Sequence, residues 1–163
     1  MAARLRARRA DRTARPDERI TMPAPAGAER LRTTGHFTYA NWEERALGED
    51  GAFPRLAHAA VTNTFDGGVE AVGTTCEYTI VYMTEKTGTF TGMELLTGAV
   101  DGRRGTFVVE ERGRFDDRGS VHCTFEVVPG SATGELAGLR GTGEFTAEHG
   151  SPSVPYTFDY DFG

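Results

Sequence analysis

Two carboxylates stand inside apolar, strand-like stretches of this sequence, where they could take part in proton transfer. Glu94 lies in the stretch Phe-Thr-Gly-Met-Glu-Leu-Leu (90–96), and Glu77 lies in Cys-Glu-Tyr-Thr-Ile-Val-Tyr (76–82). A carboxyl group in an apolar interior ionises less readily, so its pKa rises toward values that suit proton transfer or charge stabilisation. These glutamates are therefore the first candidates for chemistry.

The alternation of side chains along a strand separates the two candidates. Glu94 shares its face with Phe90 and Leu96, whereas Glu77 shares its face with threonines and Val81. The other face of the second stretch is more apolar and consists of Cys76, Tyr78, Ile80 and Tyr82. We expect Glu94 to point inward as the candidate catalytic residue and Glu77 to point outward. The alternative is that both are ordinary strand residues, hydrogen-bonded to Arg or Tyr.

Aromatic residues are frequent enough to line a hydrophobic ligand cavity. The candidates for such a pocket are Trp42, Tyr78, Tyr82, Phe107, Phe125, Tyr156 and Phe158. The same residues could instead fill the interior of a small barrel, which has room for side chains or for one small ligand. The sequence leaves both interpretations open.

Motifs for a metal or a cofactor are missing from the sequence. The four histidines (His36, His58, His122 and His149) form no His-x-His pair, and two cysteines give no metal-ligand spacing. No dinucleotide fingerprint opens a long helix, and no Gly-x-Ser-x-Gly elbow is present. We expect no metal and no cofactor, and we expect Cys76 and Cys123 to be buried thiols, a disulfide being the alternative if their strands are neighbours.

Charge is distributed unevenly along the 163 residues. Residues 1–21 hold seven arginines against three acids, whereas residues 22–163 carry a net charge of −10. An acidic body argues against nucleic-acid binding. The sequence shows neither a membrane span nor a secretory signal, which favours a cytoplasmic protein. We expect residues 1–28 to be a disordered, Arg-rich leader, with Met22 as an alternative start, and residues 29–163 to form one domain.

The rest of the chain is rich in glycine, aromatic and β-branched residues, which favours an all-β fold. Alternation and turn signals such as Asp-Gly predict eight strands, at about 31–42, 55–65, 69–83, 89–100, 104–115, 120–128, 142–148 and 154–162. Residues 43–51 read as a polar loop. Eight sequential antiparallel strands predict a closed β-barrel, because closure removes exposed edges. A two-sheet sandwich is the alternative.

One corner organises the end of the chain. After Val127-Val128, Pro129-Gly130 ends a strand, and residues 133–139 are predicted to form one helical turn with Thr133 as its cap. Leu136 and Leu139 lie on one side of that turn, and Gly141 ends it. We expect the two leucines to plug the corner.

The corner segment 127–141 resembles the hallmark of a bacterial family known as domain of unknown function 3224. Shorter similarities are Cys-Glu-Tyr (76–78), Phe-Thr-Gly-Met-Glu (90–94), Gly-Arg-Arg-Gly-Thr-Phe (102–107) and the ending Tyr-Thr-Phe-Asp-Tyr-Asp-Phe (156–162). The resemblance covers about residues 32–163. It implies an eight-stranded, calycin-like barrel of the allene-oxide-cyclase type, and it implies no established activity.

Two functions fit these observations. In the first, the barrel binds a small apolar molecule and catalyses its cyclisation or isomerisation without a cofactor, with Glu94 and Tyr78 or Tyr82 directing protons or charge. In the second, it is a non-catalytic structural or interaction barrel with a filled interior. Apolar residues on both faces around Met93–Leu96 also point to a homo-oligomer.

Overall fold

A computed structural model describes residues 29–163, and the expected leader at residues 1–28 lies outside the described residues. Eight strands follow one another along the chain. They are β1 (Leu31–Leu47), β2 (Arg55–Gly67), β3 (Val69–Tyr82), β4 (Gly88–Val100), β5 (Arg103–Phe115), β6 (Val121–Val127), β7 (Arg140–Ala147) and β8 (Val154–Asp161). The only helical element among residues 29–163 is a 3-10 turn, η1 (Gly134–Leu136).

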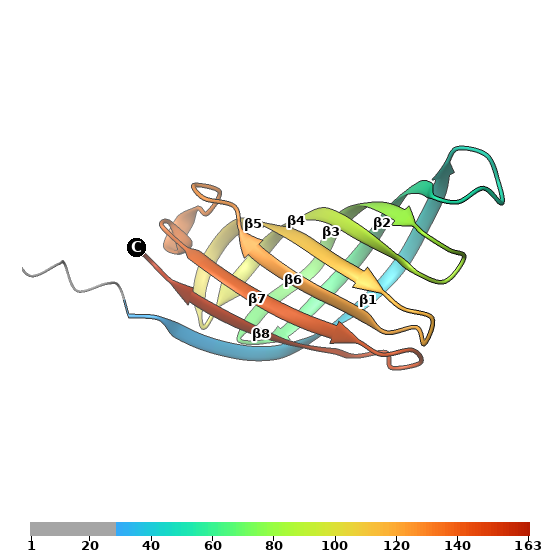
Figure 1. The fold of residues 1–163 in the computed structure, drawn as a ribbon. Helices are drawn as coiled ribbons and strands as arrows, with labels where there is room; N and C mark the ends of the chain where they lie inside the picture. Colours follow the sequence, from blue (N-terminus) through green and yellow to red (C-terminus); the bar gives the residue numbers. More distant parts are fainter. Residues whose placement is uncertain (1–28) are drawn as a thin grey trace, which may run out of the picture.

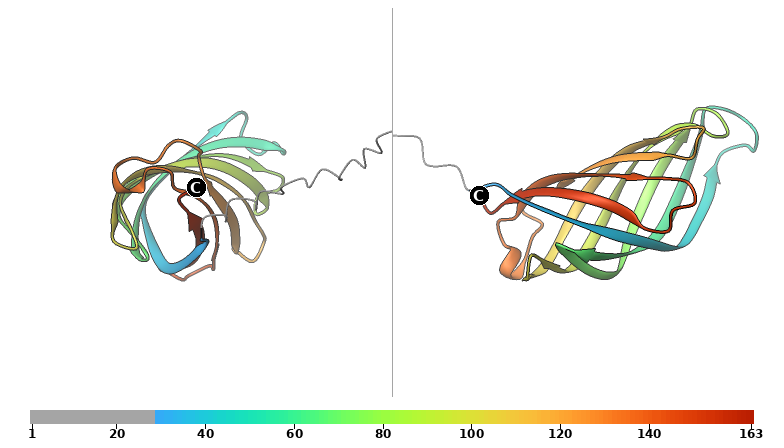
Figure 2. Two further views of the ribbon diagram at one scale, coloured as in Figure 1. Left: turned by 90° about the vertical axis from the view of Figure 1, so that its left-hand side faces the viewer. Right: turned by 90° about the horizontal axis from the view of Figure 1, so that it is seen from below.

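The strands form the closed antiparallel barrel that the sequence predicts. Each strand pairs with the next one along the chain, and β8 pairs with β1 to complete the ring. Figure 1 shows the long, tilted strands, and the left view of Figure 2 shows them arranged around a ring. The barrel, rather than the sandwich, is therefore the correct architecture.

The first strand is longer than the sequence predicts. Residues 43–47 were expected in a loop, but they continue the pairing of β1 with β2 as far as Leu47 opposite Leu56. Pairing with β8, by contrast, covers only residues 31–37 of β1. The second half of β1 is thus held on one side only, and it extends along one end of the barrel as part of a hairpin with β2 (Figure 1).

The opposite end of the barrel is plugged by the corner around η1. Leu136 and Leu139 are buried in the main core with Phe107 and Phe158. The sequence predicts that Thr133 caps this turn, but its side chain makes no capping hydrogen bond. Its Oγ1 accepts a hydrogen bond from the backbone N–H of Thr106 at 3.2 Å instead, which ties the corner to β5.

Side-chain size divides the interior into two halves. Near the plug, large inward side chains fill the space, including Phe107, Tyr156 and Phe158. Toward the other end, β2 contributes Ala57 and Ala59, and the inward positions of β4 and β5 include Gly92 and Gly113. Small residues leave volume unfilled, so the interior opens at the end away from the plug.

Truncating the plug should destabilise the whole barrel. We expect Leu136→Ala to lower the free energy of unfolding by about 3 kcal/mol, because it removes a fully buried side chain and leaves a cavity. Leu95→Ala, at an exposed position on β4, should change it by no more than about 0.5 kcal/mol. Urea denaturation followed by circular dichroism measures both, and equal losses would contradict this role of the plug.

Candidate active site

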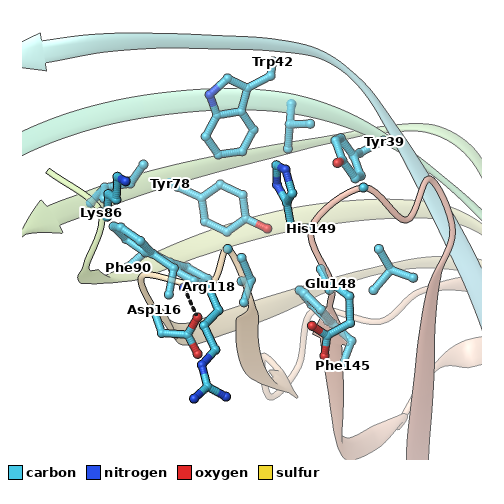
Figure 3. A pocket seen from close by; sticks show the side chains of 18 of the residues that line it. Tyr39, Trp42, Tyr78, Lys86, Phe90, Asp116, Arg118, Phe145, Glu148 and His149 are labelled. Atoms are coloured by element: carbon cyan, nitrogen blue, oxygen red, sulfur yellow. Dashed lines mark hydrogen bonds between the residues drawn. The ribbon is translucent and has the colours of Figure 1, made fainter.

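A cavity of about 680 Å³ occupies the open end of the barrel. Its walls are aromatic and aliphatic and include Trp42, Tyr78, Ile80, Phe90 and Phe145. Figure 3 shows these aromatic side chains surrounding the space, with Tyr78 in their midst. A concave, mainly apolar cavity with a few polar groups is the usual form of a small-molecule site.

The predicted pocket residues fall into two groups. Trp42, Tyr78 and Tyr82 line the large cavity. Phe107, Phe125, Tyr156 and Phe158 surround a second, nearly filled space of about 20 Å³ in the plugged half. Glu94 borders this smaller space as well, so the candidate carboxylate lies deeper than the large cavity.

Trp42 reaches the cavity because β1 is irregular at that point. The pairing with β2 shifts between Ala40 and Glu43, and Asn41 adopts a φ of 58°. Without this bulge Trp42 would share the outward face of Ala40, since faces alternate along a strand. With it, the indole stacks on Tyr78 at a ring separation of 6.2 Å.

Tyr78 connects the cavity to a second buried carboxylate, Glu111. The Tyr78 hydroxyl donates a hydrogen bond of 2.6 Å to Glu111 Oε2. Both residues lie opposite Gly92 of the intervening strand β4. A Cβ at Gly92 would come within 2.5 Å of the Tyr78 ring, so the glycine allows the tyrosine to reach across β4.

Glu94 lies inside the barrel on β4, and its side chain is held by neutral donors. Asn63 Nδ2 donates a hydrogen bond of 2.9 Å to Glu94 Oε1, and the Thr74 hydroxyl donates to the same oxygen. Thr74 faces inward because β3 bulges between Ala71 and Thr75, where Gly73 has a φ of 66°. Asn63 also lines the large cavity, so Glu94 is one residue away from it.

Glu94 and Glu111 form a buried pair. Val109 pairs with Glu94 and Gly92 pairs with Glu111, so the two glutamates are diagonal neighbours on the inner face of β4 and β5. Their exposed fractions are 1% and 3%. None of the ion pairs found within residues 29–163 includes either carboxylate. Two such groups cannot both ionise without a large free-energy cost.

The environment of the pair favours one retained proton. Burial, followed by the charge of Glu94 and a hydrogen bond to Glu94, raises the pKa of Glu111 to about 8. Sequence reasoning did not single out Glu111. Alternation along β5 could have indicated that Glu111 points inward, because it lies on the same face as Phe107, Val109 and Phe115.

Two thiols complete the surroundings of the pair. Cys76 and Cys123 are buried and free, as expected, and Cys123 Sγ lies 3.8 Å from Glu111 Oε2. Donor atoms of Cys76, Glu94 and Glu111 lie within 4.8 Å of one another, a spacing at which they could converge on a divalent cation. Burial strongly raises the pKa of both thiols, which opposes the thiolate form that binds metals. The donor set is therefore better suited to holding a proton.

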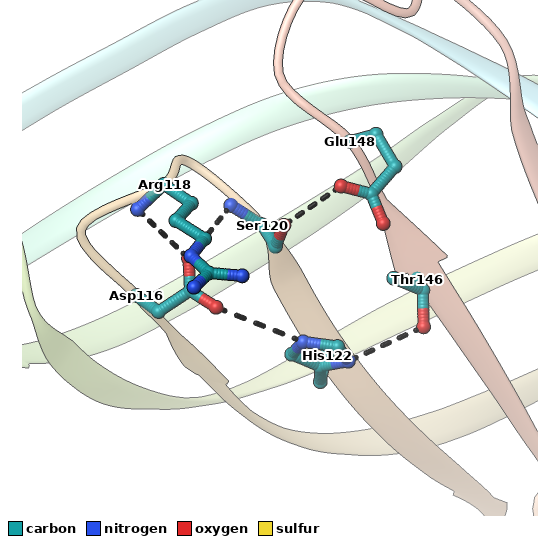
Figure 4. A network of polar contacts seen from close by, with 6 residues as sticks. All are labelled: Asp116, Arg118, Ser120, His122, Thr146 and Glu148. Carbon is teal, nitrogen blue, oxygen red and sulfur yellow. Dashed lines mark hydrogen bonds and ion pairs between the residues drawn. The ribbon is translucent and has the colours of Figure 1, made fainter.

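Polar turns border the cavity, and Figure 4 shows the contacts that join two of them. Asp116 Oδ1 accepts hydrogen bonds from the backbone N–H groups of Arg118 and Ser120 at 3.0 and 3.1 Å. The Ser120 hydroxyl donates to Glu148 at 2.7 Å, which links the turn after β5 to the end of β7. These contacts fix the shape of the rim. Glu77, by contrast, points outward, where its Oε2 lies 3.8 Å from His58 Nε2.

Comparison with known proteins shows the family of this chain. The family model described as "Protein of unknown function (DUF3224)" matches residues 33–160, and the chain belongs to this family. A crystal structure of a DUF3224 protein of unknown function from Shewanella oneidensis MR-1 is similar, with 28% identity and a TM-score of 0.65. The similarity covers 83% of this chain and 99% of that chain. The search of curated proteins found no match.

The implied likeness to allene-oxide-cyclase-type and calycin barrels stays a prediction, because none of these comparisons bears on it.

Within residues 29–163, no helix is long and apolar enough to span a membrane.

Because of the buried pair, the free energy of unfolding should depend on pH. The substitution Glu111→Gln should remove this dependence. Glu111 has a pKa of about 8 in the folded protein against an ordinary value of 4.5. Between these values the folded state retains a proton that the unfolded chain releases, so stability falls as the pH rises through this window and levels off above it. Glu94, Tyr78 and the two thiols are the titratable groups that face Glu111.

We expect Glu111→Gln to match the wild type near pH 4 and to be more stable near pH 9 by on the order of 5 kcal/mol. Glu110→Gln, on the outward face of the same strand, is the matched control and should follow the wild-type profile. Urea denaturation across this pH range measures the difference. Parallel profiles for wild type and Glu111→Gln would show that no proton is held at Glu111.

Proposed function

We propose that this DUF3224 protein binds a small, mainly apolar molecule in the open half of its barrel and isomerises or cyclises it without a cofactor. The observation that carries the proposal is the cavity of about 680 Å³, into which Tyr78 brings a hydroxyl bonded to a buried carboxyl group. An apolar cavity binds an apolar ligand by removing its surface from water. A positioned proton donor or acceptor in such a space is what acid–base catalysis needs.

The shape of the cavity supports a substrate larger than water and smaller than a peptide. Aromatic walls on several strands, including Trp42, Phe90 and Phe145, would restrict a bound molecule to few orientations. Restricting a flexible substrate in this way favours cyclisation or isomerisation, because the entropic cost of orienting it is met on binding. We place this activity in the cytoplasm, since both cysteines are free thiols.

The second candidate is a structural or interaction barrel that acts through its outer surface. Met93 and Leu95 favour it, because these large apolar side chains are more than half exposed on the outer face of β4. Exposed apolar residues of this kind are typical of contacts with another chain, including a second copy. Native mass spectrometry distinguishes the candidates: a released small molecule supports the first, and an oligomer without one supports the second.

The single tryptophan of the chain reports directly on the cavity, because it is Trp42. N-phenyl-1-naphthylamine is a neutral, apolar fluorescent probe of suitable size. We expect it to bind at one equivalent, to quench Trp42 fluorescence and to increase its own emission, since it leaves water for an apolar space. A fluorescence titration measures this binding.

Blocking the cavity provides the control. Val61→Phe places a ring in the cavity and should weaken probe binding at least about tenfold, because the free volume is lost. Thr62→Phe places the same ring on the outer face of β2 and should leave the affinity within about twofold. Unchanged Trp42 fluorescence, or equal binding by both variants, would refute a ligand site at this position.

A further inference from the structure

We propose that Tyr78, Glu111 and Glu94 form a proton relay from the cavity to a buried carboxylate, and that the ligand presents an acidic hydrogen to Tyr78. This inference rests on the proposed function, because it assumes that the cavity takes up a small molecule. It adds the contact residue, the path of the proton and the chemical class of the ligand.

The direction of the hydrogen bonds defines what the ligand meets. Tyr78 directs its hydroxyl hydrogen away from the cavity, toward Glu111 Oε2 at 2.6 Å. Tyr78 lines the cavity, and because its hydrogen is donated to Glu111, its phenolic oxygen can only accept a further hydrogen bond. A ligand with an O–H, an N–H or an activated C–H group complements this oxygen, whereas one offering only a carbonyl or ether oxygen does not.

The second link joins the two glutamates. Carboxylate oxygens of Glu111 and Glu94 lie within 4.8 Å of one another on the inner face of β4 and β5, so protonated Glu111 can direct its hydrogen toward Glu94. Glu94 then carries the negative charge of the pair, which Asn63 and Thr74 stabilise by donating to its Oε1. Tyr78 is thus hydrogen-bonded to Glu111, and Glu111 lies next to the carboxylate of Glu94.

One proton can pass along this chain with all bonds conserved. The ligand's X–H bond breaks and its proton binds the Tyr78 oxygen. The original Tyr78 hydrogen passes to Glu111 Oε2, and the hydrogen that Glu111 held passes to Glu94. The ligand is left with the electron pair of its X–H bond and one negative charge, and Glu94 becomes neutral. Reversal of the same three steps returns a proton to the ligand at a different atom, which completes a proton-shift isomerisation.

This path changes the role of Glu94. Because Tyr78 and Asn63 separate it from the large cavity, Glu94 is the terminal acceptor of the proton, while Tyr78 is the catalytic residue that touches the ligand. Tyr82 is the less suitable tyrosine. Its hydroxyl donates to Glu44, at 2.8 and 2.9 Å from the two carboxylate oxygens, and that contact is exposed to solvent.

The ligand class can be tested with two naphthalenes that differ in one hydrogen-bond donor, 2-naphthol and 2-methoxynaphthalene. At pH 7 we expect wild type to bind 2-naphthol about five- to tenfold more tightly, because only naphthol donates to Tyr78. Tyr78→Phe should bind both probes equally. Tyr160→Phe, which removes a hydroxyl from the plugged half, should keep the preference.

The relay itself can be tested with the same probe. Excitation makes the hydroxyl of 2-naphthol strongly acidic, so the bound dye emits as naphtholate when a proton path is in place. We expect naphtholate emission in wild type and its loss in Tyr78→Phe and in Glu94→Gln, with Glu94→Gln retaining the binding preference. Glu110→Gln removes a carboxylate from the outward face of β5 and should leave the emission unchanged. Circular dichroism establishes that each variant is folded, and Glu111→Gln provides a second break in the chain.

The outcomes separate the two proposals. Equal binding of both probes by wild type, or naphtholate emission that persists in Glu94→Gln and Glu111→Gln, overturns the relay and leaves the ligand site standing. Absence of binding by either probe, together with no binding of N-phenyl-1-naphthylamine, overturns the proposed function and the relay with it. Emission lost equally in Glu110→Gln would show that the loss does not depend on the buried pair, and it also overturns the relay.

Discussion

Two carboxylates side by side in the interior of a small barrel are the constraint on which the rest of this structure depends. Glu94 and Glu111 are almost completely buried, and their hydrogen-bond partners within the described chain are hydroxyl, amide and thiol groups. A buried pair of this kind is tolerable only if a proton or a cation neutralises part of its charge. Such an arrangement costs stability, so its presence in a well-packed barrel points to a use.

The barrel meets this constraint through the register of its central strands. Closure of eight strands places Glu94 and Glu111 diagonally on the inner faces of β4 and β5, with Gly92 leaving room for Tyr78. On the side of the plug, the pair borders the packed apolar core. On the opposite side, it lies next to the half of the barrel that contains the cavity. The pair therefore lies at the boundary between packed core and accessible space, where a proton can be both protected and delivered.

Much of the fold could be predicted from the sequence, because alternation along a strand is a strong local signal. Alternation also places Glu94 and Tyr78 on the inner face, and it would have placed Glu111 there had it been applied to β5. A β-bulge is harder to predict than alternation. It moves the following side chains of the strand to the opposite face, and no clear residue pattern in the sequence marks its position. The inward positions of Trp42 and Thr74 depend on two such bulges. The prediction of a loop at residues 43–47 failed because a polar strand held on one side resembles a loop in composition.

The division of the aromatic residues between cavity and core depends on which end of the barrel is plugged, which only the three-dimensional arrangement shows. Leu136 and Leu139 were expected at a corner, but no local pattern indicates that this corner closes the end near Phe107 and Phe158. The same holds for the Tyr78–Glu111 contact, which spans an intervening strand. Contacts across a sheet follow from register, and register is a property of the assembled barrel.

A carboxyl titration by NMR on protein labelled with ¹³C at the glutamate side chains tests the central claim most directly. One resonance should titrate near pH 8, and it should disappear in Glu111→Gln. If every glutamate carboxyl of the folded protein titrates in the acidic range, the buried pair holds no proton at neutral pH. The relay would then have no basis.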